Sequence, residues 1–226
     1  MDNFLKASID LHSTNDDYGA ADNYSKEQTM KYKLTIPDAL RKSTLVHPVK
    51  TVLDYGTGKG GLVHSINGTE NLNIQATGYD PAVKEFCTLP NKKFDIVTSI
   101  DVLEHIGRGY IHSTLDEIST LTNQFFFFCI DLIPASKKVK DGRNAHFLLA
   151  PPDWWCQQIK THFSVATFVE VGKTEAGDKY GIHLFGCASH SMKYFNSMNE
   201  FIGGVQLANK QWIWKESGRV VGTSFM

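Results

Sequence analysis

Apolar runs of strand length alternate with segments of helical periodicity through the middle of the chain. Such alternation indicates an α/β fold in which helices cover both faces of a parallel sheet. A run of four phenylalanines at residues 125–128 fits a strand that the sheet buries on both faces. The predicted strands cover residues 49–53, 74–79, 94–99 and 125–130, and the predicted helices between them cover residues 62–66, 81–87 and 103–121.

A helix and two strands are expected after this alternating region. They are predicted at residues 154–163, 165–171 and 182–188, with a turn at residues 172–178 that would join the two strands as a hairpin. The final segment contains Trp212 and Trp214 in alternation with other residues, which predicts one more strand or a cap.

The pattern divides the chain into three parts. Residues 1–35 are polar and aperiodic apart from a short helix expected from Ser25, and they predict an N-terminal arm or lid. Residues 36–190 hold the alternating elements and predict the main domain. Residues 191–226 predict an extension that packs on that same domain. A length of 226 residues suits one domain with a buried core.

Composition and charge exclude several classes of protein. The formal net charge is −1 and the sequence pI is about 6.7, so no basic field favours a nucleic-acid or membrane partner. The sequence shows neither a secretory leader nor an apolar run of membrane-spanning length, which predicts a cytoplasmic protein. Four widely spaced cysteines predict reduced thiols, not a disulfide framework.

The most informative segment is a glycine-rich turn after the first predicted strand. The sequence Asp54-Tyr55-Gly56-Thr57-Gly58-Lys59-Gly60 is followed some twenty residues later by Asp80, which ends the next strand. Glycines allow a tight turn that approaches a ligand closely, and the distal acid can accept hydrogen bonds from a ribose. A phosphate-binding P-loop is excluded because Lys59 is followed by glycine instead of serine or threonine.

Asp54 separates the two remaining types of nucleotide site. A carboxylate at the strand end would repel the pyrophosphate of a dinucleotide. The same carboxylate can accept a charge-assisted hydrogen bond, directly or through water, from the ammonium group of S-adenosylmethionine. The turn therefore favours S-adenosylmethionine over a nicotinamide dinucleotide.

These residues resemble the class I S-adenosylmethionine-dependent methyltransferases, which carry such a turn between two strand-end acids. The resemblance covers residues 49–188, and the segment from Phe94 to Ile106, with its Asp101-Val-Leu-Glu-His105 sequence, is similar to small-molecule methyltransferases that include ubiquinone-pathway O-methyltransferases. The segment from Asp141 to His146, with Trp154 and Trp155 after it, also resembles uncharacterised bacteriophage methyltransferases, which would place the protein in a host cytoplasm.

The resemblance implies a fold and a cofactor site. The implied fold is a doubly wound, mostly parallel seven-stranded sheet whose strand at residues 182–188 runs antiparallel near one edge. Residues 36–190 would be the catalytic domain, with S-adenosylmethionine as cofactor and S-adenosylhomocysteine as product. The implied cofactor-binding residues are Asp54, Gly56, Thr57, Gly58 and Gly60 around the methionine end, Asp80 and Pro81 near the ribose, and Ile100 and Asp101 beside the cofactor.

Two histidines are candidate catalytic residues. Methyl transfer needs alignment and, for a hydroxyl acceptor, a group that takes a proton, for which histidine is suited. His146 is the preferred residue because it follows the fifth predicted strand in a polar, turn-rich loop, and His105 is the second candidate. A histidine that is only structural is the alternative for both.

A divalent metal is a less favoured alternative, and we assign no metal ligands from the sequence. Asp101, Glu104, His105 and His146 could converge on one ion, and similar sets occur in magnesium-dependent RNA 2′-O-methyltransferases. Against this, adjacent residues on a helix such as Glu104 and His105 point about 100° apart. The Leu-Glu-His sequence is also frequent in relatives without a metal role.

The sequence therefore predicts a methyltransferase that acts on an oxygen or nitrogen of a small acceptor. An RNA methyltransferase is an alternative because Lys137, Lys138, Lys140 and Arg143 form a basic loop, but the near-neutral net charge disfavours it. A scaffold that binds the cofactor without catalysis is the other alternative, and the intact glycines and acids argue against it.

Overall fold

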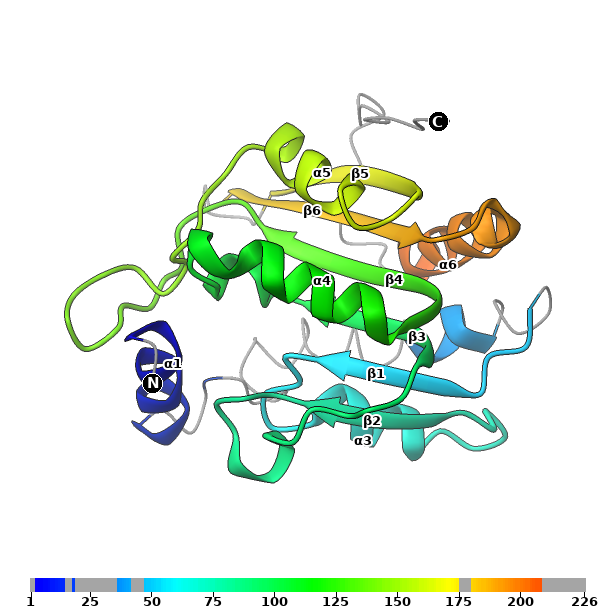
Figure 1. The fold of residues 1–226 in the computed structure, drawn as a ribbon, viewed down its shortest axis with the longest axis horizontal. Coiled ribbons are helices and arrows are strands. Elements are labelled where there is room, and N and C mark those ends of the chain that lie inside the picture. The colour runs from blue at the N-terminus through cyan, green and yellow to red at the C-terminus, as the bar shows by residue number, and fades with distance from the viewer. Residues whose placement is uncertain (1–2, 15–17, 19–35, 42–46, 175–179, 209–226) are drawn as a thin grey trace.

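A six-stranded sheet forms the centre of the structure (Figure 1). The computed structural model describes residues 3–14, 18, 36–41, 47–174 and 180–208. The strands lie in the order β2-β1-β3-β4-β6-β5. The first four pair in parallel, whereas β6 runs antiparallel to both β4 and β5. The strands are β1 (Thr51–Tyr55), β2 (Gln75–Tyr79), β3 (Phe94–Ile100), β4 (Thr122–Asp131), β5 (Val165–Thr174) and β6 (Tyr180–Ser189).

Helices cover both faces of this sheet, as expected for a doubly wound fold (Figure 1). One face packs against α4 (Ile111–Leu121) and α5 (Pro152–Lys160). The other face packs against α3 (Gly61–Asn67), α6 (Phe195–Ala208) and a short helical segment at residues 36–41. The mostly parallel α/β fold with an antiparallel strand near one edge is thereby confirmed.

The phenylalanine run forms the middle of β4 and fills both layers of the core. Phe125 and Phe127 lie in the layer that contains α6, and Phe126 and Phe128 lie in the layer that contains α4 and α5. All four are fully buried. Side chains alternate between the faces of a strand, so four consecutive apolar residues are stable only where helices cover both faces.

The strand count differs from the prediction. The sheet of the described residues has six strands, where seven were expected. Only a 3₁₀ turn at Lys84–Phe86 lies between β2 and β3, which leaves no strand and helix inserted there. The helix expected at residues 81–87 is reduced to this turn, since Val83 has an extended backbone with φ −114° and ψ 116°.

The helix expected at residues 103–121 is also interrupted. Two 3₁₀ turns, Leu103–His105 and Arg108–Tyr110, precede α4 because Gly107 between them is extended, with φ −62° and ψ 141°. The residues of Leu-Glu-His therefore lie outside the regular helix. Their side-chain directions cannot follow the helical spacing assumed from the sequence.

The terminal segments contain more structure than their sequences indicated. Helix α1 (Asn3–Thr14) occupies part of the predicted polar arm, and α6 follows a 3₁₀ turn at Met192–Tyr194 in the predicted extension. The helix expected from Ser25, the strand or cap near Trp212 and most of the expected hairpin turn lie outside the described residues. None of the helices in the described part of the chain has the length and hydropathy needed to cross a membrane.

Candidate active site

The carboxyl end of β1 turns sharply at Gly56. This residue has φ +82°, and a Cβ atom there would lie 2.4 Å from Val102 Cγ2. The backbone N–H of Gly56 donates to the carbonyl oxygen of Tyr79 at 2.7 Å, which ties the turn to the end of β2. Gly58 and Gly60 also have positive φ angles of 55° and 77°. Glycine is therefore required for the backbone path as well as for close approach.

Asp54 is buried at the end of β1. The Thr98 hydroxyl of β3 donates to Asp54 Oδ1 at 2.8 Å. Burial raises the pKa of the Asp54 carboxyl to about 6. A carboxylate with so little solvation is a favourable partner for a cationic ligand group.

Asp80 is held beside the same turn. Its Oδ2 accepts a hydrogen bond from the Gly58 N–H at 2.9 Å, and its Oδ1 accepts one from the Ala82 N–H at 2.9 Å. Each carboxylate oxygen keeps a second acceptor site, so the group can still receive donors from a ligand. Thr57 is buried within the turn, and Pro81 follows Asp80 at the surface. The acids and glycines singled out in the sequence thus come together.

The end of β3 has an unusual backbone. Asp101 has φ +54°, a left-handed conformation that is uncommon outside glycine and concentrates at functional sites. Its N–H donates to the carbonyl oxygen of Cys129 at 2.9 Å, and the Cys129 thiol donates to Asp101 Oδ1 at 3.3 Å. The half-buried Ile100 precedes it. Asp101 is therefore directed towards β4.

Three further ionisable residues form what we call the Glu104 cluster: Glu104, His105 and His146. One side-chain nitrogen or oxygen from each lies within 4.8 Å of the others. Glu104 is fully buried, and its Oε1 accepts a hydrogen bond from the Asp131 N–H at 2.9 Å. Among the described residues its Oε2 has no hydrogen-bond partner.

Both imidazoles of the Glu104 cluster are oriented by backbone carbonyls. His105 Nδ1 lies 2.8 Å from the Ala145 oxygen, and His146 Nδ1 lies 2.6 Å from the Ile133 oxygen. A carbonyl only accepts, so in both rings Nδ1 carries the proton and Nε2 keeps its lone pair. Asn144 fixes the loop before His146 by bonding to the N–H and the carbonyl of Ala135 at 3.0 and 2.8 Å.

Burial favours the uncharged forms in this cluster. Burial and the neighbouring Asp101 raise the pKa of the Glu104 carboxyl well above its ordinary value. Burial and the neighbouring His146 lower the pKa of the His105 ring to about 3. His105 is therefore neutral near pH 7 and is suited to position a ligand more than to take a proton.

The structure groups Asp101 with other potential ligands than those of the Glu104 cluster, although its charge still acts on Glu104. Glu104, His105 and His146 meet, whereas Asp101 belongs with Cys129 of β4 and His183 of β6. The Cys129 sulfur lies 4.0 Å from His183 Nδ1. The sequence did not identify Cys129 or His183 as site residues. Both lie within strands among apolar residues, where no motif marks them.

The comparison with known families identifies the chain. A family model described as a methyltransferase domain matches residues 28–170, which is more than half of the sequence. The chain belongs to the class I S-adenosylmethionine-dependent methyltransferases. No curated protein matches this methyltransferase.

Solved structures share the fold of the methyltransferase at low sequence identity. The DhpI–S-adenosylhomocysteine complex has a TM-score of 0.57 and 12% identity, covering 82% of this chain and 97% of DhpI. Magnesium protoporphyrin IX methyltransferase from Synechocystis PCC 6803 has a TM-score of 0.55 and 13% identity, covering 84% and 98%. The plantazolicin methyltransferase BpumL has a TM-score of 0.51 and 14% identity, covering 92% of each chain.

Helix α1 of the methyltransferase lies beside the loop that follows β4, and this loop carries His146 (Figure 1). The Phe4 ring packs edge-on against Phe147 and Tyr110, with centroids 5.1 and 6.0 Å apart. The Tyr18 hydroxyl lies 3.1 Å from His105 Nδ1. The sequence pattern did not indicate these residues, because the N-terminal segment is polar and shows no clear period.

The basic loop and the tryptophans contribute less to the site than their sequence indicated. Arg143 pairs with Asp141 at 2.7 Å, and its guanidinium lies over the rings of Phe4 and Phe147. Trp155 is fully buried in the core, whereas Trp154 is half-buried beneath Arg108. Of the two tryptophans, Trp154 alone keeps any exposure for contact with a ligand.

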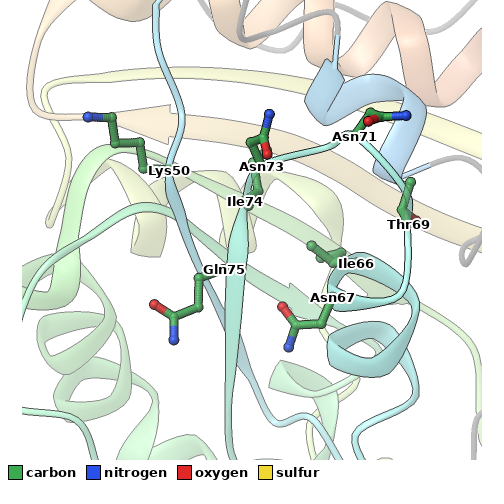
Figure 2. A pocket seen from close by; sticks show the side chains of 8 residues that line it. All are labelled: Lys50, Ile66, Asn67, Thr69, Asn71, Asn73, Ile74 and Gln75. Atoms are coloured by element: carbon green, nitrogen blue, oxygen red, sulfur yellow. The ribbon is translucent and has the colours of Figure 1, made fainter.

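A hollow of about 460 Å³ lies at the amino ends of the strands, away from the glycine turn (Figure 2). Lys50 and Gln75 mark the amino ends of β1 and β2 there, and Asn67 closes the end of α3. The hollow is lined mainly by amide side chains, and none of its lining residues belongs to the glycine turn or to the Glu104 cluster. Ligands of open α/β sheets bind at the carboxyl ends of the strands, so this hollow is not the cofactor site.

Proposed function

We propose that the methyltransferase transfers the methyl group of S-adenosylmethionine to an oxygen or nitrogen of a small-molecule acceptor and releases S-adenosylhomocysteine. The observation that carries this proposal is that the glycine turn and the Glu104 cluster both lie at the carboxyl ends of the parallel strands. The glycine turn with Asp54 and Asp80 lies at the ends of β1 and β2, and the Glu104 cluster follows the ends of β3 and β4.

The glycine turn is assigned to the cofactor. Asp54 would receive the ammonium group, the backbone from Gly56 to Gly60 would follow the methionine end, and Asp80 would accept the ribose hydroxyls. Pro81, Ile100 and Asp101 would line the remaining cofactor surface. The hydrogen bonds that fix Asp80 before any ligand arrives support this assignment, since a preorganised group loses little entropy on binding.

The Glu104 cluster is assigned to the acceptor. Methyl transfer is an in-line attack on the sulfonium methyl carbon, which the cofactor activates, so the protein must align the nucleophile and remove its proton. His146 would take that proton through its free Nε2, and His105 would position the acceptor. Tyr18 would contribute to this side through its contact with His105.

The structural neighbours support a small acceptor over RNA. Two neighbours are methyltransferases named for magnesium protoporphyrin IX and for plantazolicin, and three neighbours are complexes with S-adenosylmethionine or S-adenosylhomocysteine. Arg143 of the basic loop is engaged with Asp141 and two aromatic rings, which reduces its availability for phosphate. A cytoplasmic location stays a prediction from the sequence.

Calorimetric titration of the full chain with S-adenosylmethionine and S-adenosylhomocysteine tests the proposal. Asp80→Asn keeps an acceptor for the Gly58 N–H but loses charge-assisted bonds to the ribose, and we expect its affinity to fall about tenfold or more. The exposed Asp116→Asn on α4 is the matched control and should bind as the wild type does. An absence of binding to the wild-type chain would favour a scaffold without this cofactor.

A further inference from the structure

We propose that Glu104, His105 and His146 bind one divalent transition-metal ion on the acceptor side of the site. The inference goes beyond the proposed methyl transfer and stands on the geometry of the Glu104 cluster. With an ion bound, the lone pair of His146 Nε2 would be a ligand, so the ion would take over activation of the acceptor from His146. Two imidazoles and one carboxylate, supplied by a 3₁₀ turn and by the loop after β4, would be its ligands.

The carboxylate has an unsatisfied position that a cation would fill. Glu104 is fully buried, and Oε2 has no hydrogen-bond partner within the described part of the chain. None of the ion pairs found among the described residues includes Glu104. Burying a carboxylate without a partner is costly, and a protonated Glu104 would instead leave an O–H donor without an acceptor. A metal ion removes both costs.

The imidazoles are arranged as metal ligands usually are. A ligating histidine commonly donates its second ring N–H to a backbone carbonyl, which fixes the tautomer and the direction of the lone pair. His105 and His146 do this through Ala145 and Ile133 respectively. Glu104 is oriented in the same way, because the Asp131 N–H holds its other oxygen.

The spacing fits a single ion after a small movement. The ligand atoms lie within 4.8 Å of one another. Bonds of about 2.0–2.2 Å at tetrahedral angles place two ligand atoms of one ion about 3.3–3.6 Å apart, so the most distant pair needs to close by at most about 1.5 Å. Mixed imidazole and carboxylate ligands favour ions such as Zn²⁺ over Mg²⁺, which prefers oxygen ligands and retains its water.

Three protein ligands leave coordination positions open. A metal ion in this place would lower the pKa of an acceptor hydroxyl bound to it, which is the property that a methyl acceptor requires near neutral pH. The site would therefore favour acceptors that present an oxygen or nitrogen lone pair to the ion.

Calorimetric titration of the chelator-treated full chain with Zn²⁺ and with Mg²⁺ tests the proposal. We expect one Zn²⁺ per chain and weaker binding of Mg²⁺. Glu104→Gln, which keeps an acceptor for the Asp131 N–H, and His146→Gln should each bind Zn²⁺ at least about tenfold more weakly. His47→Gln is the matched control, because His47 lies shortly before the amino end of β1, and it should bind Zn²⁺ as the wild type does.

Co²⁺ binding can be followed by visible absorption, and this test does not depend on whether Glu104→Gln folds. Co²⁺ bound to the wild-type cluster should give visible absorption that His146→Gln weakens and His47→Gln preserves. The proposal is wrong if the wild type binds no Zn²⁺, if it prefers Mg²⁺, or if His146→Gln binds Zn²⁺ as tightly as the wild type. Titration of the metal-free chain with S-adenosylmethionine separates this failure from that of the proposed function, because the glycine turn lies outside the cluster.

Discussion

At the scale of single residues, burial sets the protonation state of the ionisable groups in the site. Asp54 and Glu104 are both carboxyls with raised pKa values, and burial is the main cause in each. Asp54 still has the Thr98 hydroxyl as a donor, whereas one oxygen of Glu104 has no partner among the described residues. The two acids are therefore suited to different cations, an organic ammonium at Asp54 and a metal ion at Glu104.

The raised pKa of Asp54 predicts a pH-dependent affinity for S-adenosylmethionine. The folded-state pKa of about 6 lies above the ordinary 3.8, so the fold favours the protonated acid. Without ligand, ionisation costs nothing below pH 4 and about 3 kcal/mol of folding stability above pH 6. Binding of the ammonium needs the ionised form. We therefore expect the affinity to fall by up to about tenfold per pH unit below pH 6.

Calorimetry between pH 5 and 8 measures this effect, with Asp54→Asn as the comparison. The variant should bind more weakly above pH 6 and lose the pH dependence that comes from this carboxyl. It should also unfold at higher denaturant concentration than the wild type above pH 6, since its ionisation cost is gone. An affinity of the wild type that stays constant across the range would contradict the assignment of Asp54 to the ammonium.

At the scale of elements, α1 packs on the domain mostly through half-buried side chains. Phe4 packs on Phe147 and Tyr110, and its ring covers Gly107, where a Cβ atom would lie 2.6 Å away. Leu11 lies in a small cluster with Val139 and Ala145. Elements with few buried contacts open locally at lower free energy than the central strands. We infer that α1 is the least stable element near the Glu104 cluster.

Phe4→Ala should release α1 without unfolding the sheet. Losing part of the ring burial costs about 1.5 kcal/mol or more locally, which corresponds to about tenfold faster amide exchange across residues 5–14. Hydrogen exchange measured by mass spectrometry should show this increase, while β1 exchanges as in the wild type. Met192→Ala, at an exposed position, serves as the control. Equal protection of α1 in both variants would mean that other contacts hold the helix.

At the scale of the whole molecule, ligand binding and folding stability are coupled. The turn after β1 and Asp80 after β2 are joined by the Gly56 and Gly58 hydrogen bonds, and unfolding separates them. A ligand that needs both binds only the folded chain. The cofactor should therefore raise the melting temperature.

The expected size of this stabilisation follows from the concentration of S-adenosylmethionine. At 100 times Kd it is about 2.7 kcal/mol. For a domain of this length that corresponds to a melting temperature about 5–10 °C higher. Scanning calorimetry of the wild type and of Asp80→Asn at one cofactor concentration measures it. An equal rise in both proteins would show that Asp80 takes no part in cofactor binding.

The sequence by itself determined the α/β fold, the glycine turn, its two acids and the family. These features are local, since a strand, a sharp turn and a helix leave their pattern in consecutive residues such as 52–66. The helix expected at residues 81–87 was wrong, because backbone propensity did not reveal the extended Val83. The described residues form six of the seven expected strands.

Only the tertiary structure decided how the ionisable residues are grouped. Asp101 and Glu104 are neighbours in sequence, yet the left-handed backbone at Asp101 and the 3₁₀ turn at Leu103–His105 direct them into different clusters. His146 joins the Glu104 cluster and His183 joins Asp101, because the carboxyl ends of β3 and β4 lie beside the start of the antiparallel β6. Such contacts depend on strand pairing between distant segments, which residue spacing alone does not encode.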